Sequence, residues 1–229
     1  MKRFLLTVLT PLLLLAGCNK QDAITYSGIE AGTIGGGVFL SDYGTTMTIV
    51  GNEEKYDVST TRRVLINYQT HPVKDSGNLE IDLLGLMDAG VLPPQSVDAL
   101  PENPDGSPFE VTDAWFSGEY LNILVAFKGV ASAKHSFSAC SKTDETGIVI
   151  RLTHDGSQDP VTAASQSLSL FLSVPVSGPA LAYEQCALAA GIKNPYPAPV
   201  TLQWTASVLE PGPITVYERK GSYTPPSAY

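Results

Sequence analysis

The stretch VTLQWTASV, residues 200–208, alternates apolar and polar side chains without a break. Its even-numbered residues are apolar and its odd-numbered residues are polar. Successive side chains of a β-strand point to opposite faces, so the pattern predicts a strand with one face in a core and the other toward solvent. Trp204, in the middle of the apolar face, is expected to be a core residue.

Short segments of the same kind recur throughout residues 109–220. Turn signals lie at Gly118-Glu119 and Asp155-Gly156. Only residues 179–191, with proline at the start and Gly191 as a stop, predict a helix. Six or seven short strands with one polar face each predict an antiparallel β-sandwich at 109–220, followed by a flexible tail at 221–229. The strands are expected at residues 109–117, 120–129, 134–142, 147–154, 165–176, 200–208 and 214–220.

Residues 27–90 predict a second, smaller β unit. Alternating segments at residues 62–69 and 78–84 follow a hairpin that turns at Asp42-Tyr43-Gly44. Gly35, Gly36 and Gly37 lie within a strand pattern, and no Lys-Ser or Lys-Thr pair follows them. We therefore expect a bulge or sharp bend there rather than a phosphate-binding loop. Four or five strands with a glycine-kinked first strand predict a small closed barrel of the OB type.

Five prolines lie between residues 87 and 108. Because proline cannot donate to a sheet, we expect no strand pairing in this stretch and predict a Pro-rich linker at 91–108, with room for a short helical turn near residues 96–100. The predicted fold class is therefore all-β, a small OB-type barrel at 27–90 followed by the β-sandwich.

The first residues have the features of an export signal. Lys2 and Arg3 precede an apolar run from Phe4 to Leu15, which is too short to span a bilayer. The ending Leu15-Ala16-Gly17-Cys18 resembles the lipobox of bacterial lipoproteins, in which the cysteine thiol is acylated and the chain is cut before it. An ordinary secretory signal with a chance cysteine is the alternative. We predict a signal peptide at 1–17 and a lipidated tether at 18–26, with Cys18 holding the protein to a membrane.

The charge balance narrows the set of partners. Loss of Lys2 and Arg3 with the signal leaves 12 basic side chains against 23 acidic ones, a net charge of −11. Nucleic acid binding depends on neutralising phosphates with Lys and Arg, so no nucleic acid partner is expected. The charge also argues against a polybasic membrane-binding face; the acyl chains on Cys18 are the expected membrane contact.

Four segments in this order resemble the NigD-like lipoproteins of Gram-negative gut bacteria. They are GGGVFLSDYGTTMTIV at 35–50, RRVLINYQ at 62–69, WFSGEYLNILVAFKG at 115–129 and IRLTHDG at 150–156. The resemblance implies an OB-type barrel joined to a β-sandwich in a cell-envelope protein, on the outer membrane. The family name comes from a presumed bacteriocin-immunity protein, which implies a protein toxin or envelope protein as partner. It supplies no catalytic or binding residues, and the connection at 179–199 departs from it.

Chemistry-bearing residues are sparse. His71, His135 and His154 are far apart in the sequence, whereas zinc ligands usually come in close pairs. We therefore expect solvated or capping histidines, no metal, no cofactor and no catalytic residue. An all-β chain can still bring Asp and His together across strands, and this keeps an enzyme as the third hypothesis, after protein binding and glycan binding.

The two cysteines of the mature body leave two alternatives open. Cys140 and Cys186 can form a disulfide in an oxidising compartment, or they can remain two buried, inert thiols.

Aromatic residues are the best candidates for a binding surface. OB barrels often bind oligomers on one face, which suggests a glycan as the alternative ligand. The barrel face could include Tyr68, although a core position is the simpler interpretation, and Tyr43 at a turn tip is expected to be exposed. The candidate binding surface consists of Tyr43, Tyr56, Trp115, Phe116 and Tyr120.

Overall fold

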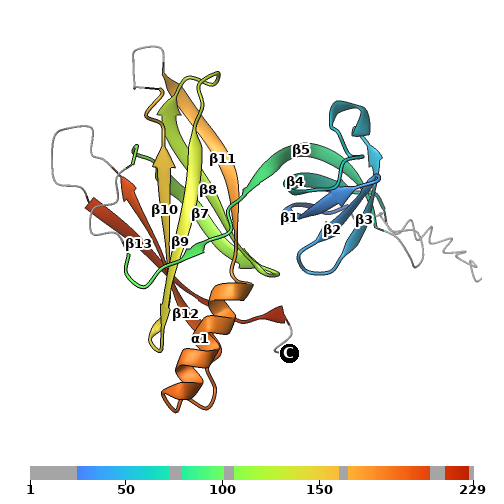
Figure 1. Ribbon diagram of the computed structural model, residues 1–229. Coiled ribbons are helices and arrows are strands. Elements are labelled where there is room, and N and C mark those ends of the chain that lie inside the picture. The colour runs from blue at the N-terminus through green and yellow to red at the C-terminus, as the bar shows by residue number, and fades with distance from the viewer. Residues whose placement is uncertain (1–24, 73–78, 101–105, 160–164, 207–214, 227–229) are drawn as a thin grey trace, which may run out of the picture.

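The structure, a computed structural model, describes residues 25–72, 79–100, 106–159, 165–206 and 215–226. These residues form thirteen β-strands, one α-helix and one short 3₁₀-helix, η1 (Glu53–Lys55). Figure 1 shows two bodies, a small one built from the first strands and a larger one that contains the remaining strands and the helix. The predicted signal peptide, most of the tether and part of the C-terminal tail lie outside the described residues.

The small body is a closed ring of five strands (Figure 1). β1 pairs with β2 and β4, β2 pairs with β3, and β4 pairs with β5, all antiparallel. A parallel pairing of β3 with β5 closes the ring. Apolar side chains from every strand fill its centre, including Ile34, Phe39, Ile49, Ile66 and Ile81. The strands are β1 (Ser27–Gly35), β2 (Val38–Ser41), β3 (Thr46–Gly51), β4 (Arg62–Thr70) and β5 (Leu79–Val91).

The triple glycine reverses the chain rather than bending it. β1 and β2 pair as a hairpin whose last register pair joins Gly35 to Val38. Gly36 and Gly37 form the turn with φ angles of 58° and 78°, a conformation that residues with a side chain rarely adopt. The prediction of a bulge or bend was wrong because two successive positive φ angles make a tight turn. The next hairpin turns at Gly44, with φ 84°, as predicted.

One strand belongs to both bodies. The first part of β5 pairs with β4, and its last residues, Ala89–Val91, pair in parallel with Phe171–Ser173 of β11 (Gln166–Pro175). The first sheet therefore runs without interruption through eight strands, in the order β3-β2-β1-β4-β5-β11-β8-β7. The expectation of no pairing at 87–108 was wrong, because the backbone up to Val91 carries free N–H groups before the first proline, and β6 (Gln95–Ser96) pairs with β9.

The larger body is a two-layer sandwich (Figure 1). Its first layer consists of β11, β8 (Tyr120–Gly129) and β7 (Glu110–Ser117). Its second has the order β13-β12-β10-β9-β6. The bounds of that layer are β9 (Ser136–Asp144), β10 (Gly147–Asp155), β12 (Ala198–Ala206) and β13 (Thr215–Tyr223). The sandwich is mixed rather than purely antiparallel, since β10 pairs in parallel with β12.

The alternating segments supply the core between these layers. Ile150 of β10, Leu202 of β12 and Ile123 of β8 are buried there, with Trp204 beside them, as the alternation at 200–208 predicts. The single helix α1 (Ser177–Ala189) covers one end of the sandwich and buries Ala180, Tyr183 and Ala187 (Figure 1). The predicted helix at 179–191 is confirmed within two residues.

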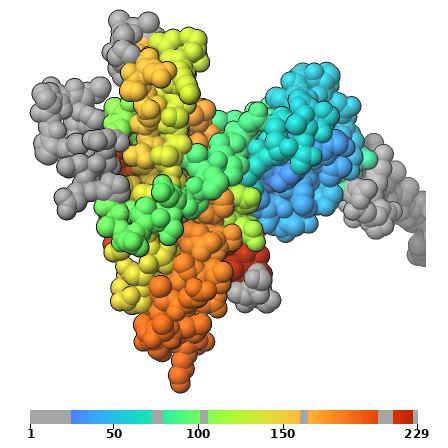
Figure 2. Space-filling model, in the orientation of Figure 1, coloured from blue at the N-terminus to red at the C-terminus, as the bar shows by residue number. Residues whose placement is uncertain are grey.

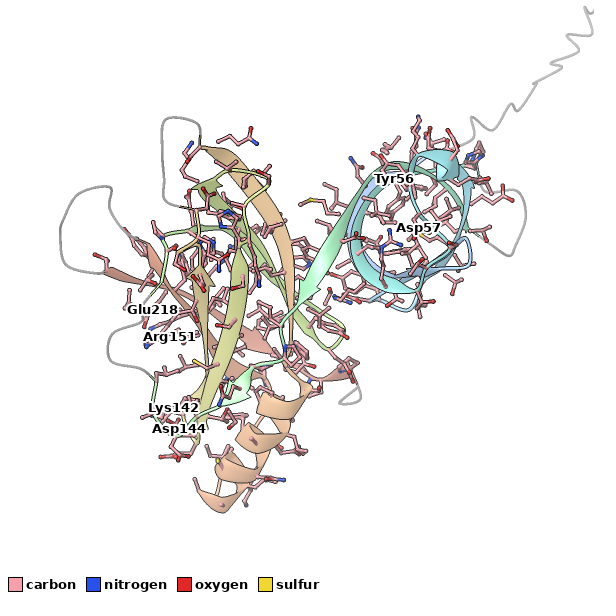
Figure 3. The ribbon with its side chains drawn as sticks, turned by 45° about the horizontal axis from the view of Figure 1, so that its top comes forward. Tyr56, Asp57, Lys142, Asp144, Arg151 and Glu218 are labelled. Atoms are coloured by element: carbon pink, nitrogen blue, oxygen red, sulfur yellow. The ribbon has the colours of Figure 1, made fainter. Side chains whose placement is uncertain are left out.

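The outer face of the second layer carries a polar ladder (Figure 3). Nη2 of Arg151 donates to Oε1 of Gln203 at 2.7 Å, and Nε2 of Gln203 donates to Oε1 of Glu218 at 2.7 Å. Nζ of Lys142 lies 3.5 Å from Oδ2 of Asp144 on the same sheet. These contacts join β10, β12 and β13 on the solvent side, opposite the core.

A buried charged group joins the two bodies. The guanidinium of Arg63, on β4, donates to both carboxylate oxygens of Asp42 at 2.8 and 2.6 Å. It also donates to Oγ of Ser173 at 2.8 Å and to Oδ1 of Asn122 at 2.9 Å, both in the sandwich. Ser117 of β7 completes the group by donating to Asp42 at 2.5 Å. We call Asp42, Arg63, Ser117, Asn122 and Ser173 the junction cluster.

Apolar packing surrounds the junction cluster. The side chains of Arg63 and Asp42 are only 6% and 8% exposed. The Arg63 guanidinium carbon lies 3.6 Å from the centre of the Tyr120 ring. Ala31 and Leu65 of the barrel pack with Phe171 of the sandwich. Figure 2 shows the two bodies in contact along this side, with β5 in green between them.

Candidate functional site

A hollow lies between the two layers of the sandwich. Its volume is about 710 Å³, within the usual range of small-molecule sites. It lies at the end of the sandwich away from α1, where β8 and β11 pair through Lys128 and Ser167. Its aromatic lining consists of Phe109, Phe127, Trp204 and Tyr217, and its deep end holds His135 and His154. We call this hollow the sandwich pocket.

The segment before β7 shapes one side of the pocket. The backbone N–H of Ser107 donates to the carbonyl of His154 at 2.7 Å, and Oγ of Ser107 accepts from the N–H of Gly156 at 2.9 Å. Phe109 then enters the core, 3% exposed, with its ring edge-on to Phe137 at 5.4 Å. The two hydrogen bonds of Ser107 hold this segment against the end of β10, and the sandwich pocket lies beside the segment.

Two histidines and an aspartate form a hydrogen-bonded chain at the deep end. Nε2 of His154, on β10, lies 3.1 Å from Nδ1 of His135, just before β9. Nε2 of His135 lies 3.0 Å from Oδ2 of Asp159, and the N–H of Val130 donates to the same oxygen. The ring of Phe137 stacks on His154 at 4.4 Å and 10°. We call His154, His135 and Asp159 the histidine chain.

Burial of the histidine chain overturns one expectation. The His135 side chain is 7% exposed and His154 is 2% exposed, so neither is the solvated or capping histidine that the sequence predicts. The β9–β10 register sets His154 opposite Phe137, which brings His135 close although it is 19 residues away. His71 is different, because its side chain is 40% exposed and contacts Asp82 at 2.7 Å.

The donor and acceptor roles along the chain depend on the tautomers of the two rings. Nε2 of His154 pairs with Nδ1 of His135, so the remaining nitrogen of His154, Nδ1, is a donor or an acceptor according to which ring supplies the proton of that bond. This Nδ1 atom is buried and has no hydrogen-bond partner among the described residues. A buried polar atom without a partner is costly, so the pocket has an open position for a hydrogen-bonding group.

Burial favours the neutral form of His154. It lowers the pKa of His154, and the neighbouring His135 lowers it further. The backbone carbonyls of Ser107 and Pro108 act in the opposite direction but do not reverse the shift. At neutral pH the deep end of the pocket therefore presents an uncharged imidazole.

The pocket walls combine flat apolar faces with polar groups. Trp204 and Tyr217, paired across β12 and β13, stack at 6.0 Å and 21°. Tyr217 is 41% exposed, so part of its ring is open to a ligand. Of the sixteen described lining residues, nine carry hydroxyl, imidazole, carboxyl or ammonium groups, among them Glu110 and Lys128. This mixture suits a ligand that is apolar on its faces and polar at its edges.

The predicted aromatic surface does not form. Tyr43 is exposed at the turn tip, as expected, whereas Trp115 stacks on Phe171 at 6.0 Å. Phe116 lies on the opposite face of β7 and packs on Tyr223, and Tyr120 lies under Arg63. Tyr56 donates to the Leu84 carbonyl at 3.3 Å. None of these five residues lines the sandwich pocket as described.

Tyr68 is a core residue of the barrel, 8% exposed. Its hydroxyl donates to Oε1 of Glu30 at 2.6 Å. Burial, together with this carboxylate, raises the pKa of Tyr68 to about 12. The core position that the sequence analysis gave as the simpler interpretation of Tyr68 is therefore confirmed.

The two cysteines are free, partly buried thiols. Cys140 lies on β9 and Cys186 on α1. Burial raises the pKa of the Cys140 thiol, against the opposing charge of Arg151. Of the two alternatives, the disulfide is absent from this structure.

The same described ranges contain neither a candidate membrane span nor a cluster of metal ligands. No helix there has both the length and the apolar character needed to cross a bilayer. No three His, Cys, Asp or Glu side chains in those ranges are placed to hold a metal ion. Cys18 lies outside the described residues, so its acylation stays a prediction.

The chain shares its fold with a NigD-like immunity protein. That structure, from Bacteroides caccae, is 20% identical, with 84% of this chain and 91% of that chain covered and a TM-score of 0.55. The resemblance suggested by the sequence is thus confirmed at the level of the fold.

Two further solved structures show the same similarity. A presumed lipoprotein from Bacteroides fragilis is 14% identical, covers 89% of this chain and 100% of its own, and has a TM-score of 0.59. A protein of unknown function from Bacteroides vulgatus is 14% identical, covers 89% and 93%, and has a TM-score of 0.57. No protein-family model and no curated protein matches the chain.

Proposed function

We propose that this chain is a lipid-anchored, non-catalytic binding protein of the bacterial cell envelope, and that its ligand binds in the sandwich pocket. The observation that carries the binding role is the unpartnered Nδ1 atom of His154, buried at the deep end of a pocket of about 710 Å³. Leaving this buried atom without a hydrogen bond costs stability in the ligand-free protein, and a bound hydrogen-bonding group removes that cost.

The sequence and the neighbouring folds support the anchored location. Ala16-Gly17-Cys18 supplies the thiol and the small residues that lipoprotein maturation uses. A presumed lipoprotein is among the proteins of the same fold. The ring order β1-β2-β3-β5-β4 supports an OB-type assignment for the barrel. We place the protein on the outer membrane.

The contacts of the imidazoles support a binding role over nucleophilic catalysis. In an Asp-His-nucleophile arrangement the histidine is hydrogen-bonded to the attacking hydroxyl or thiol. In the described part of the chain neither His135 nor His154 is bonded to such a group. The hydroxyl of Ser107 accepts a hydrogen bond from the backbone N–H of Gly156.

A protein partner is the second candidate function. One neighbour of the same fold is described as an immunity protein. Under this hypothesis the chain protects the cell by binding a toxin or its envelope target, and exposed Tyr43 is one contact residue. Pull-down from envelope extracts in mild detergent tests it, and a partner lost in Tyr43→Ala but kept in His154→Phe favours this candidate.

Two measurements test the main proposal. Mass spectrometry of the mature N-terminus is expected to show an acylated Cys18, and Cys18→Ser is expected to move the protein from the membrane to the soluble fraction. For the pocket, low-molecular-weight envelope extracts are added to the detergent-solubilised lipoprotein and its thermal midpoint is recorded. We expect a rise in the wild type that is absent in His154→Phe. An unmodified N-terminus, or no rise with any extract, contradicts the corresponding half of the proposal.

A further inference from the structure

We infer that the sandwich pocket binds a neutral saccharide, with a ring face against Tyr217 and a hydroxyl that is hydrogen-bonded to Nδ1 of His154. This inference rests on the binding role proposed above and names the chemical class of the ligand. It moves the expected glycan site from the barrel face to the sandwich.

The histidine chain ends at a position that suits a hydroxyl group. Nδ1 of His154, a residue that is 2% exposed, has no hydrogen-bond partner among the described residues. A hydroxyl group both donates and accepts, so it can pair with Nδ1 in either tautomer of His154. A purely apolar group would leave this atom unpaired.

The residues that line the pocket suit a ligand with a flat apolar ring face and polar edges. The exposed part of Tyr217, backed by Trp204, offers a flat apolar surface. Hydroxyl groups of Ser107, Ser157 and Ser167 lie around the same hollow. A pyranose has an apolar C–H face and a rim of hydroxyl groups, so it matches both features at once. A hydrocarbon or simple phenol would leave most of the polar rim without a partner.

The charges at the rim favour a neutral ligand. Glu110 and Lys128 contribute one charge of each sign, and Nζ of Lys128 is held by Oγ of Ser167 at 2.8 Å. No cluster of basic side chains lines the described pocket, so a sulfated or acidic glycan would gain no strong ion pair there. The volume is sufficient for a short saccharide, and longer chains would continue into solvent.

The test uses the detergent-solubilised mature lipoprotein on an array of neutral and acidic glycans, followed by titration calorimetry with the best neutral hit. We expect His154→Phe, which keeps an aromatic ring but removes the ring nitrogens, to weaken binding about tenfold, the scale of one hydrogen bond. Tyr217→Ala is expected to weaken it by a similar factor. The matched control is Tyr43→Ala, an exposed tyrosine on the barrel, which should bind like the wild type.

Deoxy analogues of the hit locate the bond. One deoxy analogue is expected to bind the wild type about tenfold more weakly, yet to bind His154→Phe no worse than the parent sugar does. Tyr217 is exposed, so its variant keeps the test valid if His154→Phe fails to fold. Circular dichroism checks both variants.

The outcomes separate the two proposals. An empty neutral array overturns the saccharide inference, as does neutral binding that survives both pocket variants or is lost in Tyr43→Ala. If the array is empty but envelope extracts still raise the thermal midpoint of the wild type and not of His154→Phe, the binding role stands and the ligand class is wrong. If neither the array nor the extracts give a response, both are wrong.

Discussion

Two buried polar groups of the described structure, the junction cluster and the histidine chain, differ in how completely their hydrogen bonds are made. In the junction cluster, Arg63 and Asp42 are bonded to each other and to Asn122, Ser117 and Ser173. In the histidine chain, the bonds run from Asp159 to His154 and then stop at Nδ1. A complete buried network fixes a structure, whereas one with an open end leaves a position for something outside the protein.

The largest effect is expected from breaking the junction cluster. Arg63→Ala leaves the Asp42 carboxylate buried without its cation, and we expect a loss of about 3–5 kcal/mol in the free energy of unfolding. Urea unfolding followed by circular dichroism measures it. The control is the adjacent Arg62→Ala, whose side chain bonds the exposed Asp88 at 2.5 Å. Its expected loss is about 1 kcal/mol or less, and equal losses for the two arginines would show that the junction is not a special site.

A neutral member of the junction cluster should matter less. Asn122 is fully buried; its Oδ1 accepts from Arg63 and Ser173, and its Nδ2 donates to Ser117 at 2.6 Å. Asn122→Ala leaves these buried groups without their hydrogen-bond partner. We expect the free energy of unfolding to fall by about 1–3 kcal/mol in the same urea assay. Asn67→Ala, at an exposed position of β4, is the control with an expected change of about 0.5 kcal/mol or less. A loss at Asn122 no larger than at Asn67 contradicts the prediction.

The histidine chain is expected to make the free energy of unfolding depend on pH. The pKa of His154 is lowered in the folded protein, so below its ordinary value of about 6.5 the unfolded chain binds a proton that the folded chain does not. The contribution of His154 to stability is therefore complete above pH of about 6.5 and is lost as the pH falls below it. Unfolding curves between pH 7.5 and 5.0 measure this loss, which should be smaller in His154→Phe. Parallel curves for the two proteins would remove His154 as the source.

The smallest effect is expected at the barrel surface. Tyr43 is 68% exposed at a turn tip, so Tyr43→Ala should change the free energy of unfolding by about 0.5 kcal/mol or less. Thermal unfolding by calorimetry checks this. A loss of several times that size would mean that Tyr43 has a packing role that its exposure conceals.

Local patterns predicted most of the strands but not the site. The even-numbered residues of β10 face the core, and the alternation that buries Ile150 and Leu152 also buries His154, which was expected to be a solvated or capping residue. The contact with His135 could not be predicted, because it depends on the register of β9 against β10. Asp159 is joined to them by a loop whose path no short-range pattern specifies.

The junction cluster is a second case in which contacts between distant segments could not be predicted from the sequence. Arg62 and Arg63 are identical neighbours in the sequence, and only the docking of the sandwich on one face of β4 separates a surface ion pair from a buried one. The end of β5 was missed because prolines at 93 and 94 suggested a linker, although the chain before them still has its N–H groups. The turn at Gly36-Gly37 was missed because glycines permit a bend and a reversal equally.

Because β5 is hydrogen-bonded within the ring at one end and to β11 at the other, a pull applied to the barrel is passed to the sandwich through backbone bonds in shear. Rotation of one body against the other requires these bonds to break along with the Arg63 contacts. The orientation of the sandwich pocket is thus fixed relative to the orientation of the barrel.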